Sequence, residues 1–138
     1  MNKYFDSCLY FRLNRVLRTL SQYADSAFAP HGMTSSYAYL LILVDMYPRV
    51  GTVELSQELN LSPSTVTRLV DKLVLSGYLA RVKDGKRCEI SCTESGSRMA
   101  TELEVTWLEF QQNTSEQVSS ELYASLNQEL RKLERRID

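Results

Sequence analysis

Hydroxyl-bearing and charged side chains recur along residues 62–72 at the spacing of one exposed face of a helix. The face comprises Ser64, Thr65, Thr67, Arg68, Asp71 and Lys72, and it follows directly on Ser62 and Pro63. Hydroxyls and backbone N–H groups at a helix N-terminus bind phosphate oxygens or base edges, and an arginine binds guanine bidentately or a phosphate. The chemistry indicated is nucleic-acid binding. For any single residue of this face, the alternative is an ordinary solvated position on a helix surface.

A second set of cations follows that helix, in a pattern typical of a β-hairpin. Residues 78–82 and 88–92 read as short strands, and the Asp84-Gly85 pair between them is a hairpin signal. The predicted turn spans residues 83–87, and its basic side chains can enter a minor groove or bind phosphates beside it. We therefore expect DNA contacts from Arg81, Lys83, Asp84, Lys86 and Arg87.

The charge of the chain is unevenly distributed. Residues 62–87 contain six Lys or Arg and two Asp, a local net charge of +4. Residues 88–138 contain five Lys or Arg and ten Asp or Glu, a local net charge of −5, and the whole chain has a formal net charge of −1. A basic region on an acidic body is compatible with DNA binding, because the local field rather than the sum attracts the phosphates.

Two short amphipathic helices must position these groups. The first is expected over residues 52–59, and two further residues link it tightly to the second. Ser62 is the expected N-cap of the second helix, where Pro63 suits the first helical position. The buried face of that helix comprises Val66, Leu69, Val70, Leu73 and Val74. Two such helices followed by a hairpin predict a winged helix-turn-helix, with one helix in the major groove and Thr52 as a further candidate DNA contact.

Helical periodicity also marks both flanks of this region. Apolar residues recur at helical spacing over residues 5–28, and further helices are expected over residues 35–46, from a cap at Thr34 or Ser35, and around residues 99–110. A final helix has an apolar stripe formed by Val118, Leu122, Leu126, Leu130, Leu133 and Ile137. This stripe exceeds what one small domain needs to bury, which predicts a helical interface with a second copy of the chain. The alternative is packing within one chain.

The remaining reactive residue types form no catalytic or metal-binding constellation in the sequence. His31 is the single histidine, and no nucleophile motif, Gly-rich phosphate loop or zinc-protease motif accompanies it. The three cysteines are an odd number, so free thiols are expected. Cys88 and Cys92 share one side of a strand and read as small core residues rather than zinc ligands. We therefore expect no enzyme, no metal and no cofactor.

Several of these segments together resemble the MarR family of dimeric bacterial winged-helix transcriptional regulators, over nearly the whole chain. The matching segments are LSQEL at residues 55–59, SPSTVTRLVDKL at residues 62–73 and GYL at residues 77–79, with Arg81. The resemblance implies a mainly α-helical protomer with a small β-hairpin wing. It implies a DNA-binding winged-helix lobe at residues 33–96, between dimerisation helices at residues 1–32 and 97–138.

The wing pattern of this family is partly retained. The family has Asp, any residue and Arg, followed by Leu-Thr and a Gly. Here Asp84, Thr93 and Gly96 fit this pattern, whereas Lys86 and Cys92 replace the Arg and the Leu. The family's Arg reaches the minor groove, so the resemblance implies that Lys86 has this role. Lys86 keeps the charge but lacks the planar fork of arginine, and Arg87 is expected to share the contact.

The resemblance also implies a signal that regulates DNA binding. Many relatives hold a small phenolic or aromatic ligand between the dimerisation helices and the DNA-binding lobe. Candidate lining residues are Tyr10, Tyr23, Tyr37, Tyr39, Trp107 and Phe110, each of which also reads as an ordinary core aromatic.

A second implied signal is oxidative. One branch of the family senses organic hydroperoxides through a cysteine near the start of its first helix, held by tyrosines of the partner subunit. Cys8 has a similar place, with Arg12 one turn on to favour the thiolate. Tyr23, Tyr37 and Tyr39 are the candidate tyrosines. The alternative is a thiol that simply packs beside the apolar stripe.

The sequence thus predicts a dimeric, sequence-specific regulator that binds a pseudo-palindromic operator in double-stranded DNA. It is expected to be a repressor released by a small-molecule or oxidative signal. The alternative function is a winged helix that binds other proteins and has no specific DNA site. No run of 18 apolar residues and no signal-peptide pattern is present, so a soluble cytoplasmic protein without membrane contact is expected.

Overall fold

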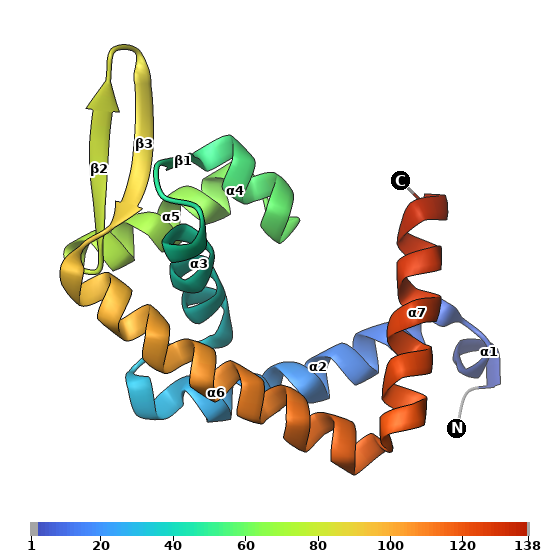
Figure 1. Cartoon of the computed structure of the whole chain (residues 1–138). Coiled ribbons are helices and arrows are strands. Elements are labelled where there is room, and N and C mark those ends of the chain that lie inside the picture. The colour runs from blue at the N-terminus through green and yellow to red at the C-terminus, as the bar shows by residue number, and fades with distance from the viewer. Residues whose placement is uncertain (1–2, 138) are drawn as a thin grey trace. The chain divides into compact units, whose positions relative to one another are not determined.

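The computed structural model describes residues 3–137, which divide into two compact units, one that ends at Glu104 and one that starts at Val105. The first unit contains α1 (Lys3–Asp6), α2 (Leu9–Phe28), the 3-10 helix η1 (Ala29–His31), α3 (Ser35–Met46), β1 (Val50–Gly51), α4 (Thr52–Leu59), α5 (Pro63–Leu75), β2 (Leu79–Asp84), β3 (Arg87–Cys92) and the start of α6 (Glu94–Val118). The rest of α6 and α7 (Ser120–Ile137) form the second unit (Figure 1). The expected fold class, a mainly helical winged helix-turn-helix, is confirmed. The functional division at residues 33–96 stays a prediction.

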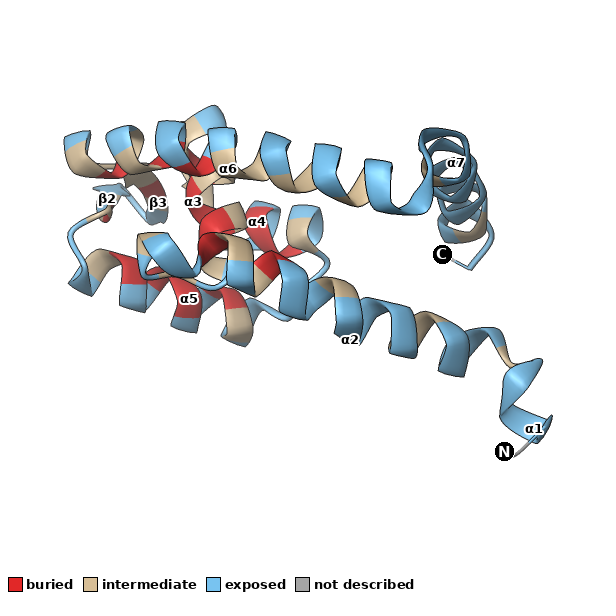
Figure 2. Ribbon diagram, turned by 90° about the horizontal axis from the view of Figure 1, so that it is seen from below, coloured by how far each residue is buried: buried red, intermediate tan, exposed pale blue. Residues whose placement is uncertain are grey.

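The core of the first unit gathers around α3, which is apolar on most of its sides. Leu40, Leu41 and Val44 of this helix are fully buried, and α3 packs against α2, α5 and β3. Further fully buried side chains of the unit are Phe28, Leu55, Val66, Val70, Ile90 and Leu103. Figure 2 shows buried positions on α3, α4, α5 and the first turns of α6. The two helices of the helix-turn-helix are therefore held by a shared apolar core.

The turn between α4 and α5 has the hydrogen bonds of a Schellman motif. Asn60 adopts a left-handed conformation with φ 50° and ψ 45°, and its N–H donates to the carbonyl of Gln57 at 3.2 Å. The N–H of Leu61 donates to the carbonyl of Ser56 at 3.0 Å. Asparagine tolerates the left-handed region better than most residues, so it ends α4 without the usual glycine. The predicted bounds of α4 are confirmed.

The sheet has three antiparallel strands in the order β1-β3-β2. Its register pairs Val50 with Ile90, and Asp84 with Arg87 at the tip of the hairpin. The predicted five-residue turn at residues 83–87 is therefore wrong, because pairing continues to Asp84 and leaves only Gly85 and Lys86 as the turn. Gly85 has a positive φ of 61° and Lys86 does not, which fits a type II′ turn.

The N-terminal helix differs from the expected single helix. The chain leaves helical conformation at Ser7 and Cys8, so α1 and α2 are separate. The predicted continuous helix from Phe5 is wrong there, because apolar periodicity continues across a two-residue break. The start of α3 was expected to be capped by its own side chains. Instead the Asp25 carboxylate of α2 accepts bonds from the N–H of Ser35 at 2.8 Å and from its hydroxyl at 2.7 Å.

The second unit contains the turn from α6 into α7. Ser119 has a φ of 87°, and its hydroxyl accepts a hydrogen bond from the N–H of Leu122 at 3.3 Å. Val118 therefore ends α6, and its predicted place in the last helix is wrong because this left-handed residue separates the helices. No residue of α7 is buried, and its side chains Leu122, Leu126 and Leu130 are exposed. Within residues 3–137, none of the helices has the length and apolar character needed to span a bilayer.

Candidate nucleic-acid interface

The N-terminus of α5 is built from the cap predicted by the sequence. Ser62 has an extended backbone, and its hydroxyl accepts a hydrogen bond from the N–H of Thr65 at 3.2 Å. The same hydroxyl lies 2.7 Å from the hydroxyl of Thr65 and 3.1 Å from that of Ser64. Pro63 has no N–H to leave unsatisfied in this first turn. The α5 N-terminus thus presents the clustered hydroxyls of Ser62, Ser64 and Thr65, which suit a phosphate oxygen.

Arg68 lies on the exposed face of α5, one turn beyond this cluster. Its side chain is exposed, and no hydrogen-bond or ion-pair partner for its guanidinium is found among residues 3–137. Thr67 is also exposed, but its hydroxyl donates to the carbonyl of Pro63 at 2.9 Å and is therefore available mainly as an acceptor. Arg68 is the cation of α5 that is free to bind a ligand.

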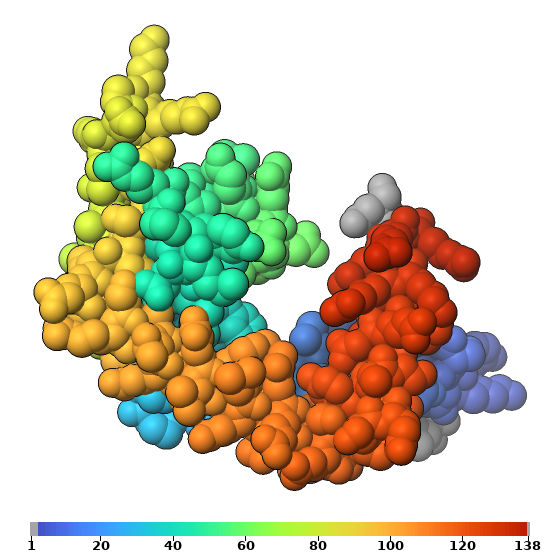
Figure 3. Space-filling model, in the orientation of Figure 1, coloured from blue at the N-terminus to red at the C-terminus, as the bar shows by residue number. Residues whose placement is uncertain are grey.

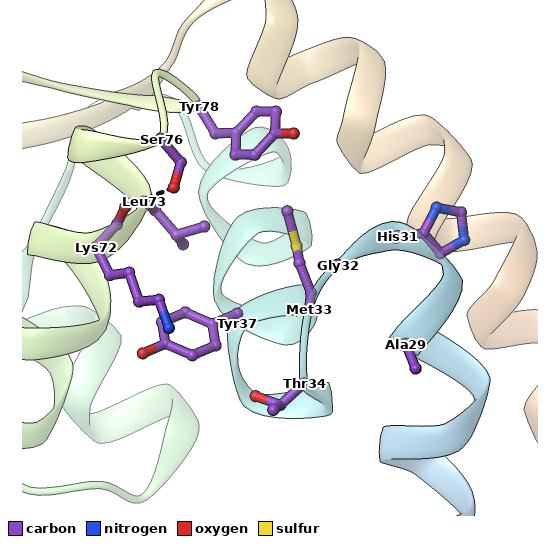
Figure 4. Close-up of a pocket in the computed structure, with 10 residues that line it drawn as sticks. All are labelled: Ala29, His31, Gly32, Met33, Thr34, Tyr37, Lys72, Leu73, Ser76 and Tyr78. Atoms are coloured by element: carbon purple, nitrogen blue, oxygen red, sulfur yellow. Dashed lines mark hydrogen bonds between the residues drawn. The ribbon is translucent and has the colours of Figure 1, made fainter.

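Lys72 was grouped with Arg68 by helical spacing, but its ammonium lies elsewhere. Its Nζ is 4.9 Å from the centroid of the Tyr37 ring, within the range of a cation–π interaction. Tyr37 belongs to α3, so Lys72 connects α5 with α3 within the first unit. Figure 4 shows this lysine beside the tyrosine ring at the edge of a cavity. The structure therefore separates Lys72 from Arg68, although both lie on α5.

Arg81 is likewise engaged within the protein. Its guanidinium donates to the carboxylate of Asp71, which joins β2 to the exposed face of α5. The side chains of Arg81 and Asp71 are 37% and 54% exposed, so water screens the pair partly. Both residues had been placed on the DNA-facing surface from the sequence.

The tip of the hairpin carries the remaining cations. Lys83, Lys86 and Arg87 are exposed, and no ion pair of theirs is found in the described chain. Asp84 lies opposite Arg87 in the strand register. The hairpin extends away from the helices of its unit (Figure 1), and Figure 3 shows its tip as a narrow projection. A basic projection of this width can approach a phosphate backbone without a clash from the helices.

Two charged residues at the base of the hairpin were not identified from the sequence. Arg49 precedes β1 with a φ of 64°, and its Nε lies 4.0 Å from Oε2 of Glu89 on β3. That oxygen is buried and accepts no hydrogen bond within the described residues. The strand that brings Arg49 to the sheet has only two residues, which is too short to give a periodic signal. Thr52, a predicted contact, is half-buried at the start of α4.

A cavity of about 570 Å³ lies in the first unit, between the segment that follows α2 and the helix-turn-helix (Figure 4). Its lining comprises Ala29, His31, Gly32, Met33, Thr34, Tyr37, Lys72, Leu73, Ser76 and Tyr78. This volume is within the range of small-molecule sites. Tyr37 and Lys72 supply an aromatic ring and a cation, and the latter comes from α5 itself.

Within the first unit, the predicted ligand-site tyrosines do not all line this cavity. Tyr37 lines the cavity, whereas Tyr10 and Tyr23 are 67% and 55% exposed. Tyr39 packs edge-on against Phe28, with ring centroids 6.1 Å apart. In the second unit Trp107 and Phe110 contact each other, with centroids 5.7 Å apart.

The predicted redox residues lie at the break before α2. Cys8 is half-buried, and its carbonyl accepts from the N–H of Arg12 at 3.1 Å. The guanidinium of Arg12 donates to the carbonyl of Asp6. This bond holds Arg12 next to the break, but a role for Cys8 in sensing oxidants stays a prediction.

The other two cysteines have different environments on β3. Cys88 is exposed at the wing, so its predicted place in the core is wrong: pairing extends the hairpin beyond the helices. Cys92 is half-buried, and its Sγ lies 3.8 Å from the carbonyl oxygen of Leu41. Burial, followed by the negative charge of Asp45, raises the pKa of Cys92 to about 12. No cluster of three metal-ligating side chains is found within residues 3–137.

Residues 31–87, from the edge of the cavity to the tip of the hairpin, match the MarR family. An uncharacterized HTH-type transcriptional regulator of Bacillus anthracis is 24% identical over 90 residues. Those residues are 65% of this chain and 61% of that protein, so the chain spans less than two thirds of this relative.

Solved structures share the fold of this chain at low sequence identity. A MarR-family transcriptional regulator from Rhodococcus sp. RHA1 has a TM-score of 0.82 and 20% identity, covering 96% of this chain and 97% of that one. MepR of S. aureus, solved in complex with DNA, has a TM-score of 0.80 and 18% identity, covering 91% and 95%. CouR from Rhodococcus jostii RHA1, bound to p-coumaroyl-CoA, has a TM-score of 0.77 and 19% identity, covering 96% and 95%.

Proposed function

Through residues 31–87 the chain belongs to the MarR family, and we propose that it is a transcriptional regulator that binds double-stranded DNA. One observation carries the proposal: four cations of one lobe have no partner within the described residues. They are Arg68, Lys83, Lys86 and Arg87. Unpaired cations on a protruding surface release counterions from DNA when they bind phosphates. MepR, which shares the fold, was solved with DNA bound.

In the proposed complex α5 occupies the major groove. Its 13 residues span about 20 Å, and its exposed N-terminal turn bears the hydroxyls that approach a phosphate. Arg68 follows one turn later and reaches a base edge or phosphate. The hairpin tip, with Lys86 at the turn, contacts the neighbouring minor groove or its phosphates.

The proposed active form is a homodimer. The side chains of Leu122, Leu126 and Leu130 on α7 are 49%, 48% and 39% exposed, and Leu9 and Leu17 on α2 are 53% and 61% exposed. Apolar stripes on two helices favour burial against a second copy of the chain. The two α5 helices of such a dimer, about 34 Å apart, would then bind a pseudo-palindromic operator, since each helix occupies one half-site.

Fluorescence anisotropy tests the DNA proposal. A duplex is first selected from a random library by the wild-type protein, and its affinity is compared with that of a shuffled duplex at several salt concentrations. We expect roughly a thousandfold preference for the selected duplex and a steep loss of affinity with salt. Equal, weak binding to both duplexes would contradict the proposal and support the alternative of a winged helix that binds proteins.

We further propose that a small phenolic or aromatic ligand in the cavity releases the protein from its operator, as expected of a repressor. The cavity supports this proposal by its size, by the ring of Tyr37 and by the cation of Lys72. Because Lys72 and Leu73 belong to α5, a ligand there touches the helix that reads DNA. CouR, a protein of the same fold, was solved with p-coumaroyl-CoA bound.

Two variants test the ligand proposal with DNA binding as the readout. Met33→Trp fills the cavity, and Tyr37→Ala removes its ring. Salicylate and p-coumarate are titrated against the protein–duplex complex. We expect one of them to release the wild-type protein, and both variants to bind the duplex but to lose this response. A response that survives in the filled variant would place the ligand elsewhere.

A further inference from the structure

The six cations of residues 62–87 fall into two groups. Lys72 lies over the Tyr37 ring, and Arg81 is bonded to Asp71, so these two are engaged within the protein. The other four, Arg68, Lys83, Lys86 and Arg87, have no such partner in the part of the chain that the structure describes. The sequence alone had treated all six as equivalent candidates for DNA contact.

Arg81 lies at the level where the hairpin joins the lobe. It is paired across the strands with Ile90, which is buried, and Ile90 is paired on its other side with Val50 of β1. At this level the hairpin is thus held on one side by β1 and on the other by the ion pair to α5. The next pair along the hairpin, Val82 with Glu89, is also held by β1, because Glu89 pairs with Gly51. Beyond it the hairpin has only its own cross-strand bonds as far as the turn at Lys86, over roughly 10 Å. A rotation at the base would therefore move the tip relative to α5.

On α5 the ion pair lies close to Arg68, the residue proposed to contact a base edge or phosphate. Asp71 is three positions after Arg68, so the two share a face of the helix. The Asp71–Arg81 pair consequently connects the turn that presents Arg68 with the base of the hairpin that presents Lys86. The pair is also neutral as a whole, since the carboxylate balances the guanidinium. A neutral pair releases few counterions from DNA.

We propose that Asp71 and Arg81 are positioning residues that set the angle between α5 and the wing, and that Arg81 does not act as a phosphate ligand. The proposal rests on the DNA-binding function proposed above. A specific site requires the groove helix and the wing to bind simultaneously, whereas nonspecific binding requires only positive charge. Loss of the pair should therefore weaken binding to the selected duplex and spare binding to random DNA.

Three variants and one control separate this role from direct contact. Arg81→Ala and Asp71→Asn should each reduce affinity for the selected duplex by roughly three- to tenfold, because a partly exposed pair couples modestly. On a random-sequence duplex each should change the affinity less than on the selected duplex, because only the one charge left unpaired acts there. The charge-swapped double variant, Asp71→Arg with Arg81→Asp, should recover affinity for the selected duplex. Lys86→Ala is the control, and should reduce affinity for both duplexes and lower the salt slope by about 0.9.

A direct phosphate contact predicts the opposite pattern. Arg81→Ala would then weaken binding to both duplexes and flatten the salt dependence, while Asp71→Asn would strengthen binding by releasing Arg81. Either result would overturn the proposal.

Hydrogen exchange of the free protein tests the same pair without DNA. Both single variants should accelerate exchange of the β2 and β3 amides, and unchanged exchange would contradict the positioning role. If the wild-type protein shows no preference for the selected duplex, the proposed function fails, and the exchange rates still decide whether the pair holds the wing.

Discussion

A Cβ atom on Gly96 would overlap the backbone carbonyl oxygen of Tyr78. The start of α6 therefore packs directly on the backbone that leads into β2. The hydroxyl of Thr93 strengthens this junction, because it donates to the carbonyl of Gly77 at 2.6 Å and accepts from the N–H of Gly96 at 3.1 Å. The base of the wing and the first turn of α6 thus form one joint.

Substitution of Gly96 should loosen this joint. Gly96→Ala places a methyl group against a backbone oxygen, which cannot rotate away as a side chain would. We expect the free energy of unfolding to fall by about 3 kcal/mol, despite the better helix propensity of alanine. Urea unfolding measures the loss, and Thr101→Ala on the exposed side of the same helix is the control. If both variants had the same free energy of unfolding, the junction would accommodate the added methyl group without loss of stability.

The cap of α5 allows stability to be separated from DNA binding. Ser62→Ala removes the acceptor for the Thr65 N–H and should lower the free energy of unfolding by about 1 kcal/mol. Ser62→Asp keeps a capping oxygen, so its stability should stay near that of the wild type. The added carboxylate should nevertheless repel phosphates and reduce DNA affinity. Unfolding curves and anisotropy on the same samples check both expectations, and undiminished affinity of Ser62→Asp would exclude a phosphate at this helix end.

Arg68 and Lys72 form a matched pair of cations on one helix. Arg68→Ala should reduce affinity for a selected duplex by roughly tenfold to a hundredfold, because the proposed contact of its guanidinium with a base edge or phosphate is lost. Lys72→Ala should change that affinity by about twofold at most, since its ammonium lies over Tyr37. Anisotropy on the selected duplex compares the two. Equal losses would mean that Lys72 leaves the tyrosine when DNA binds.

The thiols should differ sharply in reactivity. Because the pKa of Cys92 is raised to about 12, its thiol stays protonated in the folded protein at pH 8, whereas Cys88 is exposed. Iodoacetamide followed by peptide mass spectrometry should label Cys88 in the native protein, and Cys92 only after unfolding in urea. Native labelling of Cys92 at the rate of Cys88 would contradict the burial of its thiol.

The same shift of pKa predicts a dependence of stability on pH. Between pH 9 and about pH 12 the unfolded chain releases the Cys92 proton while the folded chain retains it. The unfolded state then binds fewer protons, so this residue lowers the free energy of unfolding as the pH rises. Cys92→Ala should remove that part of the decline when unfolding is compared across this range.

The elements with local signals were predicted well from the sequence. The bounds of α4 and the start of α5 depend on caps and on apolar periodicity, which are signals carried by residues close together in the sequence. The predicted Ser62 cap is confirmed. The wing was also predicted, but its turn was too long. Cross-strand pairing between Asp84 and Arg87 determines that turn, and local composition does not show which residues will pair.

The features that were missed depend on contacts distant in sequence. Strand β1 exists because Val50 pairs with Ile90, 40 positions later, and two residues give no pattern of their own. Lys72 shares a helical face with Arg68, yet a ring from α3 holds its ammonium. The cap of α3 comes from Asp25, although Thr34 and Ser35 both looked suitable. Side-chain pairing across the core therefore sets the final arrangement of the site.

The strand order of the small sheet also bears on how the protein behaves at high concentration. With β3 in the centre, β2 is the long edge strand and could in principle pair with a strand from another molecule. That edge contains Arg81, Lys83 and Asp84, and charged side chains on an edge hinder such pairing. These charges on β2 thus also protect the protein against aggregation, and their combined neutralisation should make it prone to form sheet-based fibres.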